Sequence, residues 1–232
     1  MSEIADDLSG EVEGIFKTKW DIRDGRVVPD PDDVQLGNDA VRLEGTVLYA
    51  DLADSTELVK KFQWWFAAAV YKSYLVCVCR IIRENGGEIT AFDGDRVMAV
   101  FIDKGRDAAA ARAALQINYA VANIINPRIK EAFPKATYKM QQAVGVDRSV
   151  LYAARTGIRG SNDLVWVGTS ANLAAKMCSL RQQYPTYISA SVYNNLDNST
   201  LYAGNPRQNM WNSYRWTEQG VTVYRSTFVW PP

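Results

Sequence analysis

The spacing of apolar and polar positions predicts six elements in the first part of the chain: a strand, a helix, two strands, a second helix and another strand. Strands are expected where apolar residues alternate or form short runs, and helices where they recur every three to four residues. The six elements are expected over residues 41–50, 54–84, 88–92, 95–102, 107–133 and 137–146. This order is that of the split βαβ arrangement, so we predict an α+β fold with a ferredoxin-like βαββαβ core.

Turn and capping residues mark the boundaries of these elements. Asp54 and Ser55 are good helix N-caps, and Asn85-Gly86-Gly87 is typical of a helix end. Asp93-Gly94 is a two-residue hairpin signal between the second and third strands. A third strand that returns by a tight hairpin runs antiparallel to the first strand if it inserts beside it. The start of the third strand then lies next to the end of the first.

Beyond residue 146 the patterns are shorter. Residues 148–163 are expected to form a long loop or irregular hairpin, and Thr169 or Ser170 can cap a helix that runs to about Gln183. The remaining elements are a strand over 164–167, a strand over 187–189, a short helix over 191–196, and a closing hairpin over 211–217 and 221–229. At the other end, residues 1–40 are rich in turn-formers, and we expect an arm that docks on a surface. The alternative is a partly disordered tail.

Composition excludes several classes of function. The chain has 232 residues, of which 47% are apolar, and its 26 basic residues balance its 26 acidic ones. This balance gives no support for a nucleic-acid surface, where clustered basic charge is expected. The complete absence of histidine excludes His-based zinc sites and Ser-His-Asp or Cys-His nucleophiles.

The cysteines and apolar runs indicate a soluble cytoplasmic protein. Cys77, Cys79 and Cys178 are expected to be buried thiols in a reducing compartment. The start of the chain is acidic and lacks the apolar core of a signal peptide. The longest apolar stretch, 64–79, is expected to be too short to span a bilayer.

Candidate chemistry gathers where the first and third strands meet. Asp51 ends the first strand and Asp95 begins the third, so the predicted topology makes these two carboxylates neighbours. Two facing carboxylates repel each other and gain from a shared cation, and carboxylate oxygens suit Mg²⁺ or Mn²⁺. The alternative is two solvated acids at strand ends.

Two further groups of residues suit a nucleotide. The segment Ala53, Asp54, Ser55 and Thr56 follows Asp51, and the N–H groups at a helix start suit a phosphate, although plain capping is the alternative. Asn172 and Lys176 lie four apart and therefore share one helix face. An amide and a cation suit a ribose and a developing phosphoryl charge, and the alternative is a solvated helix face.

The strand-end Asp51, the Gly94-Asp95 hairpin and the segment WVGTSANLAAKM over 166–177 together resemble the class III nucleotide cyclase domain. The resemblance covers residues 41–229 and implies a catalytic domain over 41–232 with an N-terminal arm over 1–40. It implies two metal ions held by Asp51, Leu52 and Asp95, and a head-to-tail homodimer in which Asn172 and Lys176 serve the partner's site. It also implies attack of the ribose 3′-hydroxyl on the α-phosphorus of a nucleoside triphosphate, with pyrophosphate leaving.

The sequence departs from the purine cyclases of that family at informative positions. The position of the transition-state arginine is Lys176, which keeps the charge but loses the bidentate fork. The two base-reading positions are Ala91 and Val165, and apolar side chains there cannot hydrogen-bond a purine edge. Tyr49 and Arg96, which flank the two aspartates, resemble those of the bacterial pyrimidine cyclases of the Pycsar anti-phage systems.

The narrower resemblance implies the function in more detail. UTP or CTP would be converted to the cyclic monophosphate, a second messenger for a separate effector, with Tyr49 near the base and Arg96 on phosphates. An ordinary strand-end aromatic and a surface ion pair are the alternatives for these two residues. A purine cyclase and a non-catalytic nucleotide-binding or dimerisation module remain open. A palm-type polymerase lacks support because the hairpin has no paired glycines with adjacent acids.

Overall fold

The computed structural model describes residues 2–180 and 184–232, which divide into two compact units. The larger unit comprises residues 45–149 and 169–232, and the smaller comprises 1–44 and 150–168. Two long strands, β2 (Asp39–Leu52) and β5 (Gln142–Ile158), contribute residues to both units. Each unit is described by itself. The predicted division near residue 40 stays a prediction.

The larger unit is built on a sheet with the strand order β10-β11-β7-β5-β2-β4-β3. The strands are β3 (Glu88–Asp93), β4 (Arg96–Phe101), β7 (Thr186–Ser189), β10 (Asn212–Trp216) and β11 (Val221–Ser226). The segment β5-β2-β4-β3 has the predicted ferredoxin-like order, with β4 antiparallel to β2. The C-terminal hairpin of β10 and β11 extends the sheet, so the predicted fold is confirmed.

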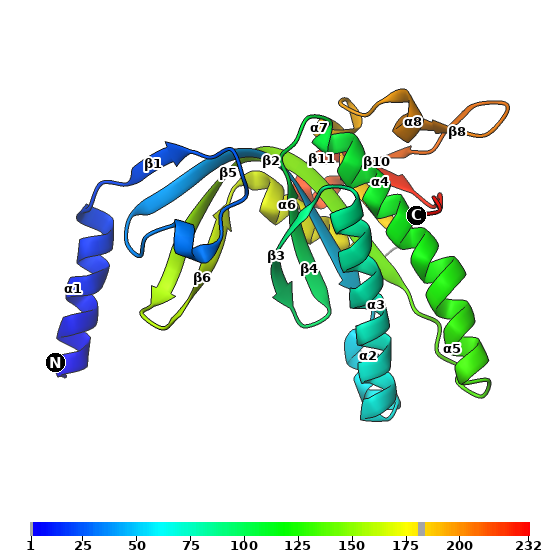
Figure 1. The fold of residues 1–232 in the computed structure, drawn as a ribbon, viewed down its shortest axis with the longest axis horizontal. Helices are drawn as coiled ribbons and strands as arrows, with labels where there is room; N and C mark the ends of the chain where they lie inside the picture. The colour runs from blue at the N-terminus through cyan, green and yellow to red at the C-terminus, as the bar shows by residue number, and fades with distance from the viewer. Residues whose placement is uncertain (1, 181–183) are drawn as a thin grey trace. The chain divides into compact units, whose positions relative to one another are not determined.

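Helices cover the two faces of this sheet. On one face α3 (Trp64–Glu84) and α4 (Arg106–Tyr119) form the main core, into which β2 directs Leu48, Ala50 and Leu52 (Figure 1). Because strand side chains alternate, Tyr49 and Asp51 belong to the opposite face. There α6 (Thr169–Cys178) packs through Met177 against Tyr187 of β7.

Two predicted helices are interrupted. The helix expected over 54–84 is split into α2 (Ser55–Lys61) and α3, because Phe62 adopts an extended conformation (φ −122°, ψ 161°). The helix expected over 107–133 contains a π-helical stretch, Ala120–Ile125, between α4 and α5 (Asn126–Ala132). At 21 residues, α3 is long and apolar enough to cross a membrane, contrary to the expectation of a shorter stretch, but its apolar face packs in the core.

Of the two alternatives predicted for 148–163, the long loop is wrong, and the structure has a hairpin. β5 continues to Ile158 and pairs antiparallel with β6 (Ser161–Val167), and Gly160 closes the hairpin with φ +84°. The strand expected from residue 137 begins instead at Gln142. The helix expected to reach Gln183 ends at Cys178 in α6, and residues 181–183 lie outside the described residues.

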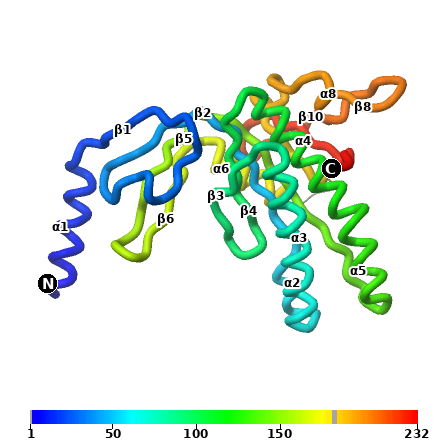
Figure 2. Tube along the Cα trace, in the orientation of Figure 1, coloured from blue at the N-terminus to red at the C-terminus, as the bar shows by residue number. Residues whose placement is uncertain are grey.

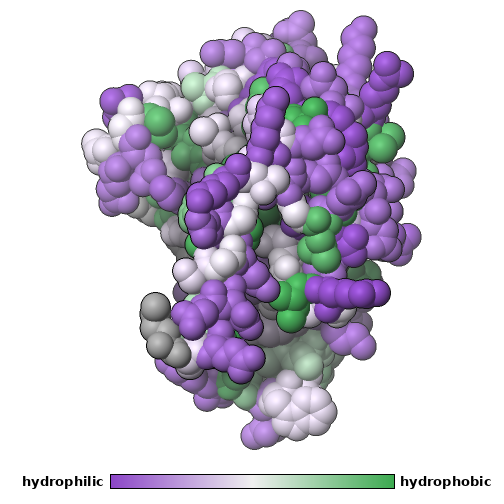
Figure 3. Space-filling model, turned by 90° about the vertical axis from the view of Figure 1, so that its left-hand side faces the viewer, coloured by the Kyte–Doolittle hydropathy of each residue, from purple (hydrophilic) through white to green (hydrophobic). Residues whose placement is uncertain are grey.

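The smaller unit begins with α1 (Glu3–Lys17) and β1 (Asp21–Asp24), which pairs parallel with the start of β2. A 3₁₀ turn, Pro31–Asp33, follows. Arg155 ties this unit together by donating hydrogen bonds to Val34 O, Asp32 Oδ1 and Asn162 Oδ1. None of the α1 residues is buried, and apolar side chains appear among hydrophilic ones on the face shown in Figure 3.

The chain after β7 forms short elements before the C-terminal hairpin (Figure 2). They are α7 (Ala190–Tyr193), α8 (Asn198–Leu201), β8 (Tyr202–Ala203) and β9 (Gln208–Asn209).

Of the three cysteines only Cys178 is buried, whereas Cys77 and Cys79 on α3 are half-buried. The expectation of three buried thiols is therefore wrong for the latter two, which lie at the margin of the α3 core face.

Candidate active site

The pairing of β2 with β4 brings the two predicted metal-binding aspartates together. Asp51 is the register partner of Arg96, so Asp95 lies one residue beyond the end of the ladder. Because Asp93 pairs with Arg96, the hairpin loop consists of Gly94 and Asp95. This turn lies one residue later than the Asp93-Gly94 signal predicts. Only Gly94 has a positive φ, +61°, as a type II′ turn requires at its first central position.

The electrostatics of this corner are set by a buried carboxylate and an arginine. Asp51 is 4% exposed, and Arg96 Nη2 lies 3.5 Å from its Oδ2. Burial, the largest single effect, lowers the pKa of the Arg96 guanidinium, but the charge of Asp51, its hydrogen bond with Arg96 and the charges of Cys178 and Asp93 together leave that pKa raised. The pKa of the buried Tyr74 hydroxyl is raised by burial and then by the charges of Cys178, Asp51 and Asp95. Both carboxylates therefore act on one buried group of α3.

The donor set suits a hard cation. Carboxylate oxygens of Asp51 and Asp95, with the backbone of Leu52 beside them, are oxygen ligands of the kind that Mg²⁺ and Mn²⁺ prefer. No group of three or more His, Cys, Asp or Glu side chains that could hold a metal exists in the described part of the chain. One chain thus supplies two carboxylates, and substrate phosphates or water would supply further ligands.

One backbone N–H group in the turn after Asp51 already donates a hydrogen bond within the protein. The Ala53 N–H donates to Gln141 O at 2.9 Å, so of the four predicted phosphate-binding residues this one has its backbone donor occupied. Asp54 adopts a left-handed conformation (φ 57°, ψ 31°) that is uncommon outside glycine, and Ser55 and Thr56 open α2. Phosphate binding by this turn stays a prediction.

Asn172 and Lys176 lie together on the exposed side of α6, as their spacing predicts. Lys176 Nζ donates to Gln219 Oε1 at 3.1 Å, which ties it to the turn of the C-terminal hairpin. The buried side of α6, with Ala174 and Met177, faces the sheet. The two residues therefore point away from the strands that carry Asp51.

Three contacts fix α6 on the sheet. Ser149 Oγ of β5 donates to Ser170 Oγ at 2.8 Å. A Cβ at Gly145 would lie 2.2 Å from Ala174 O, so only glycine allows this approach. At the far end Cys178 Sγ donates to Tyr49 O at 2.9 Å. The helix that carries Asn172 is thus anchored to the strand that carries Asp51.

The remaining predicted residues occupy separate places. Tyr49 is half-buried on β2, with its hydroxyl pKa raised by burial. Ala91 is half-buried on β3 opposite Met98. Val165 is exposed on β6 in the smaller unit.

Sequence reasoning missed the parts played by Gly145, Cys178 and Tyr74. A glycine inside a strand is a signal of close backbone approach. For Cys178 and Tyr74 the sequence gives no signal of a role at the site, because they lie among apolar residues like any core side chain.

Comparison with known proteins supports the fold and shows the family. No family model matches the chain. It is 45% identical over 229 residues to a uridylate cyclase of Burkholderia cepacia and 43% identical over 229 residues to one of Xanthomonas perforans, with 98% of each chain covered in both cases. Among solved structures, a bacterial light-regulated adenylyl cyclase superposes with a TM-score of 0.70 at 21% identity, over 84% of this chain and 54% of the other.

The guanylyl cyclase Cya2 superposes with a TM-score of 0.67 at 16% identity, over 82% of this chain and 95% of the other. These structures share the fold, and the uridylate cyclases are similar over nearly the full length. The chain therefore belongs to the uridylate cyclase family of class III nucleotide cyclases, and it is a nucleotide cyclase.

Proposed function

We propose that this protein is a uridylate cyclase that converts UTP to 3′,5′-cyclic UMP and pyrophosphate. The observation that carries the proposal is the β2–β4 register, which puts Asp51 beside Asp95 at the strand ends. The full-length similarity to proteins named uridylate cyclase supports uracil as the base. CTP remains the competing pyrimidine substrate.

The two aspartates and Arg96 would handle the triphosphate. Asp51 and Asp95 would hold two divalent cations, Mg²⁺ or Mn²⁺, which when bound neutralise phosphate charge and polarise the α-phosphoryl group. In this structure the Arg96 guanidinium contacts the Asp51 carboxylate. In the substrate complex it would instead bind the phosphates, whose negative charge increases in the transition state. The ribose 3′-hydroxyl would lose its proton to water as its oxygen bonds to the α-phosphorus, while the bond from that phosphorus to the bridging β-phosphate oxygen breaks and pyrophosphate leaves.

The outward direction of Asn172 and Lys176 supports a shared active site. Both lie on the side of α6 opposite to the residues that pack on the sheet, so a second chain would bring them to Asp51 and Asp95. We propose a head-to-tail homodimer in which Asn172 orients the ribose and Lys176 stabilises the transition state. Lysine offers charge without the planar fork of arginine, which leaves phosphate contacts for Arg96.

The base would be selected by shape more than by hydrogen bonds. Tyr49 offers a ring beside the proposed cation site, and Ala91 and Val165 supply no polar group to read a purine edge. A site without such groups discriminates weakly between bases that fit, so the small pyrimidine would be favoured by packing. Asp54, Ser55 and Thr56 are proposed to contact the phosphates.

Product analysis tests the proposal. The purified protein is incubated with ATP, GTP, CTP or UTP and Mn²⁺, and the products are separated by chromatography. Cyclic UMP from UTP is expected, with at least a 100-fold loss of rate in Asp51→Asn and in Asp95→Asn, because each removes a charged oxygen ligand. Asp103→Asn, at an exposed loop position, serves as the matched control. Product from ATP or GTP alone would refute the assignment.

We also propose a cytoplasmic role in anti-phage defence, in which the cyclic nucleotide activates a separate effector protein. The full-length similarity to the uridylate cyclases supports the formation of cyclic UMP, on which this role rests. Cells carrying this chain with an effector protein that responds to cyclic UMP should form fewer plaques than cells carrying Asp51→Asn with the same effector. Equal plaque counts at equal protein levels would contradict the role, while the product analysis above would stand.

A further inference from the structure

An apolar groove lies between the junction of α2 with α3 and the segment that follows α5. It has a volume of about 510 Å³, and its apolar lining consists of Phe62, Trp65, Phe66, Phe133, Pro134 and Ala136. Trp65 is 49% exposed, and its neighbour Trp64 is 77% exposed. Soluble proteins seldom leave large apolar patches uncovered, and those that remain mark interaction sites. The groove is therefore a candidate docking surface in the larger unit.

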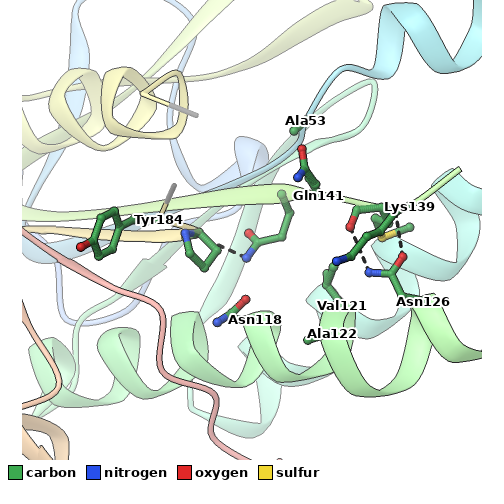
Figure 4. Close-up of a pocket in the computed structure, with 11 residues that line it drawn as sticks. Ala53, Asn118, Val121, Ala122, Asn126, Lys139, Gln141 and Tyr184 are labelled. Carbon is green, nitrogen blue, oxygen red and sulfur yellow. Dashed lines mark hydrogen bonds between the residues drawn. The ribbon is translucent and has the colours of Figure 1, made fainter. Parts of the chain in front are cut away.

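The groove is formed without a partner. The ring centroid of Phe66 lies 5.0 Å from that of Phe62 and 5.0 Å from that of Phe133, so ring contacts join its two sides. Asn126, at the start of α5, donates to Met140 O at 3.0 Å and accepts from Met140 N at 2.7 Å (Figure 4). These two bonds hold the segment after the groove close to α5. A surface that is already ordered loses little conformational entropy when a partner binds.

The two segments that form the groove carry an excess of positive charge. Residues 57–66 and 128–139 contain six basic and two acidic side chains, in a chain whose overall charge is zero. Both acidic side chains already pair with basic neighbours on their own helices. Lys130 and Lys135 are exposed and make no ion pair in the described part of the chain. The chemistry of the groove therefore suits a partner that is both apolar and acidic.

The helix α1, in the smaller unit, has this complementary character. Within residues 3–17 five acidic side chains outnumber one basic side chain. Its large apolar side chains recur every three to four residues, which places them on one face of the helix. All of them are at least half exposed, and they are Ile4, Leu8, Val12, Ile15 and Phe16. No residue of α1 is buried, so the described part of its own chain leaves this face uncovered.

We propose that the apolar face of α1 from a second copy of this chain docks in this groove. An amphipathic helix binds an apolar groove through side chains that lie one and two turns apart, as Ile4, Leu8 and Val12 do. The acidic side chains of α1 then lie near Lys130 and Lys135, so the two surfaces are complementary in charge. Two copies of α1 packed on each other would instead place acidic residues against acidic residues. An anionic membrane would suit the groove but repel α1. The contact is separate from the proposed pairing that shares the active site.

Carbodiimide cross-linking of isotope-labelled chains tests the contact and its source. Unlabelled and nitrogen-15-labelled full chains are mixed, left to exchange, cross-linked, digested and examined by mass spectrometry. Amide links are expected between α1 carboxylates and Lys130 or Lys135, and about half of them should join a labelled to an unlabelled peptide if chains exchange at random. Lys104, exposed on the loop before α4, is the control and should not be linked to α1. Absence of the α1 links, or links only between peptides of equal label, would overturn the proposal.

Two variants test the apolar part of the contact. Leu8→Asp places a charge on the exposed face of α1, and Trp65→Ala removes a ring from the groove. Each should lower the yield of links between labelled and unlabelled chains at least about fivefold, because a few apolar anchors carry most of the energy of such an interface. Val76→Asp, at a 57% exposed position about three turns further along α3, is the matched control and should leave the yield unchanged. Wild-type yields in both Leu8→Asp and Trp65→Ala would overturn the proposal.

Vesicles distinguish the other occupant. The full chain is sedimented with vesicles of phosphatidylserine and phosphatidylcholine, and it is expected to stay in solution because α1 covers the groove. Binding to the vesicles that is lost in Trp65→Ala, together with the absence of α1 links, would assign the groove to an anionic membrane and overturn the proposal. Neither experiment uses a nucleotide, so these outcomes are independent of whether UTP is cyclised.

Discussion

Arg96 lies 3.5 Å from a carboxylate oxygen that the proposed reaction needs for a cation. Its position at the first residue of β4 follows from the sequence, because it comes directly after the hairpin that holds Asp95. Its contact with Asp51 does not follow, since that contact depends on which strand β4 pairs with and on the side-chain conformation. The neighbouring positions of Asp51 and Asp95 were thus predictable, whereas the ion pair between Arg96 and Asp51 required the structure.

Replacing Arg96 with glutamine is expected to have two opposite effects. The Mn²⁺ concentration for half-maximal activity should fall several-fold, because a cation no longer competes with the guanidinium for Asp51. The maximal rate should fall by about 10- to 100-fold, because a group that stabilises phosphate charge is lost. Activity measured against Mn²⁺ concentration checks both effects, with Arg128→Gln, an exposed arginine paired with Glu131, as the control. A higher Mn²⁺ requirement would contradict this role.

Asp147 and Asp197 are expected to affect the pH dependence of folding stability in opposite directions. Burial raises the pKa of the Asp147 carboxyl above 3.8, whereas the hydrogen bond from Ser199 lowers the pKa of Asp197. The folded state holds the Asp147 proton more tightly than the unfolded state, so this group's stabilisation is present below about pH 4 and is lost as pH rises through the raised pKa. The stabilisation from Asp197 is present above about pH 4 and is lost as pH falls through its lowered pKa.

Melting temperatures of two variants test this pair. Asp147→Asn should raise the melting temperature relative to wild type by a few degrees at pH 7 and by less at pH 4, for a stability change of about 1 kcal/mol. Asp197→Asn should lower it at pH 7 and approach wild type at pH 4, because the lost charge matters only where it is ionised. The same shift at both pH values for either variant would show that charge is not the cause.

At the scale of elements, α6 depends on a single glycine for its distance from β5. The helix and its exposed pair Asn172 and Lys176 were predictable from spacing and capping. The β5–β6 hairpin was predicted only as one of two alternatives, beside a long loop, because its residues carry turn-like Gly and Ser positions that pairing with a neighbour overrides. The break at Phe62 between α2 and α3 was missed for a different reason, because apolar periodicity continues across it.

Gly145→Ala is expected to displace α6. The added Cβ would meet Ala174 O at 2.2 Å and Met177 Cβ at 2.8 Å, and backbone cannot yield as a flexible side chain does. A loss of about 1–3 kcal/mol of unfolding free energy is expected from such overpacking, with a larger proportional fall in cyclase rate. Gly10→Ala on α1, where no atom lies within 4 Å, should instead be neutral or stabilising by about 0.5–1 kcal/mol. Denaturant unfolding and rate assays on both variants measure this difference, and an unchanged Gly145→Ala protein would refute the constraint.

At the scale of the whole molecule, the sequence predicted the fold class and the strand order, because each crossover and hairpin was marked by local signals. It did not predict the two compact units, since that division follows from contacts of segments far apart in the chain. The proposed homodimer belongs to the same scale, because it concerns surfaces that no periodicity marks.

Mixing two inactive chains tests the shared site. Asp51→Asn and Asn172→Ala should each abolish activity alone, but a mixed dimer retains one site with Asp51 from one chain and Asn172 from the other. With random exchange half the dimers are mixed and each has one of two sites intact, so about a quarter of wild-type activity is expected. Inactive mixed dimers, verified by differential tagging, would rule out this geometry.

The two-residue hairpin that holds Asp95 has no spare length. Since strand side chains alternate, one residue inserted or deleted between Asp93 and Arg96 would turn the following strand over and remove the carboxylate from its partner. In a deep insertion–deletion library, in-frame length changes at these positions should therefore vanish under selection for function. Changes in the 204–207 loop should persist. Because its length is fixed, the hairpin gives a reliable reference position for aligning distant members of such a family, even where few other residues match.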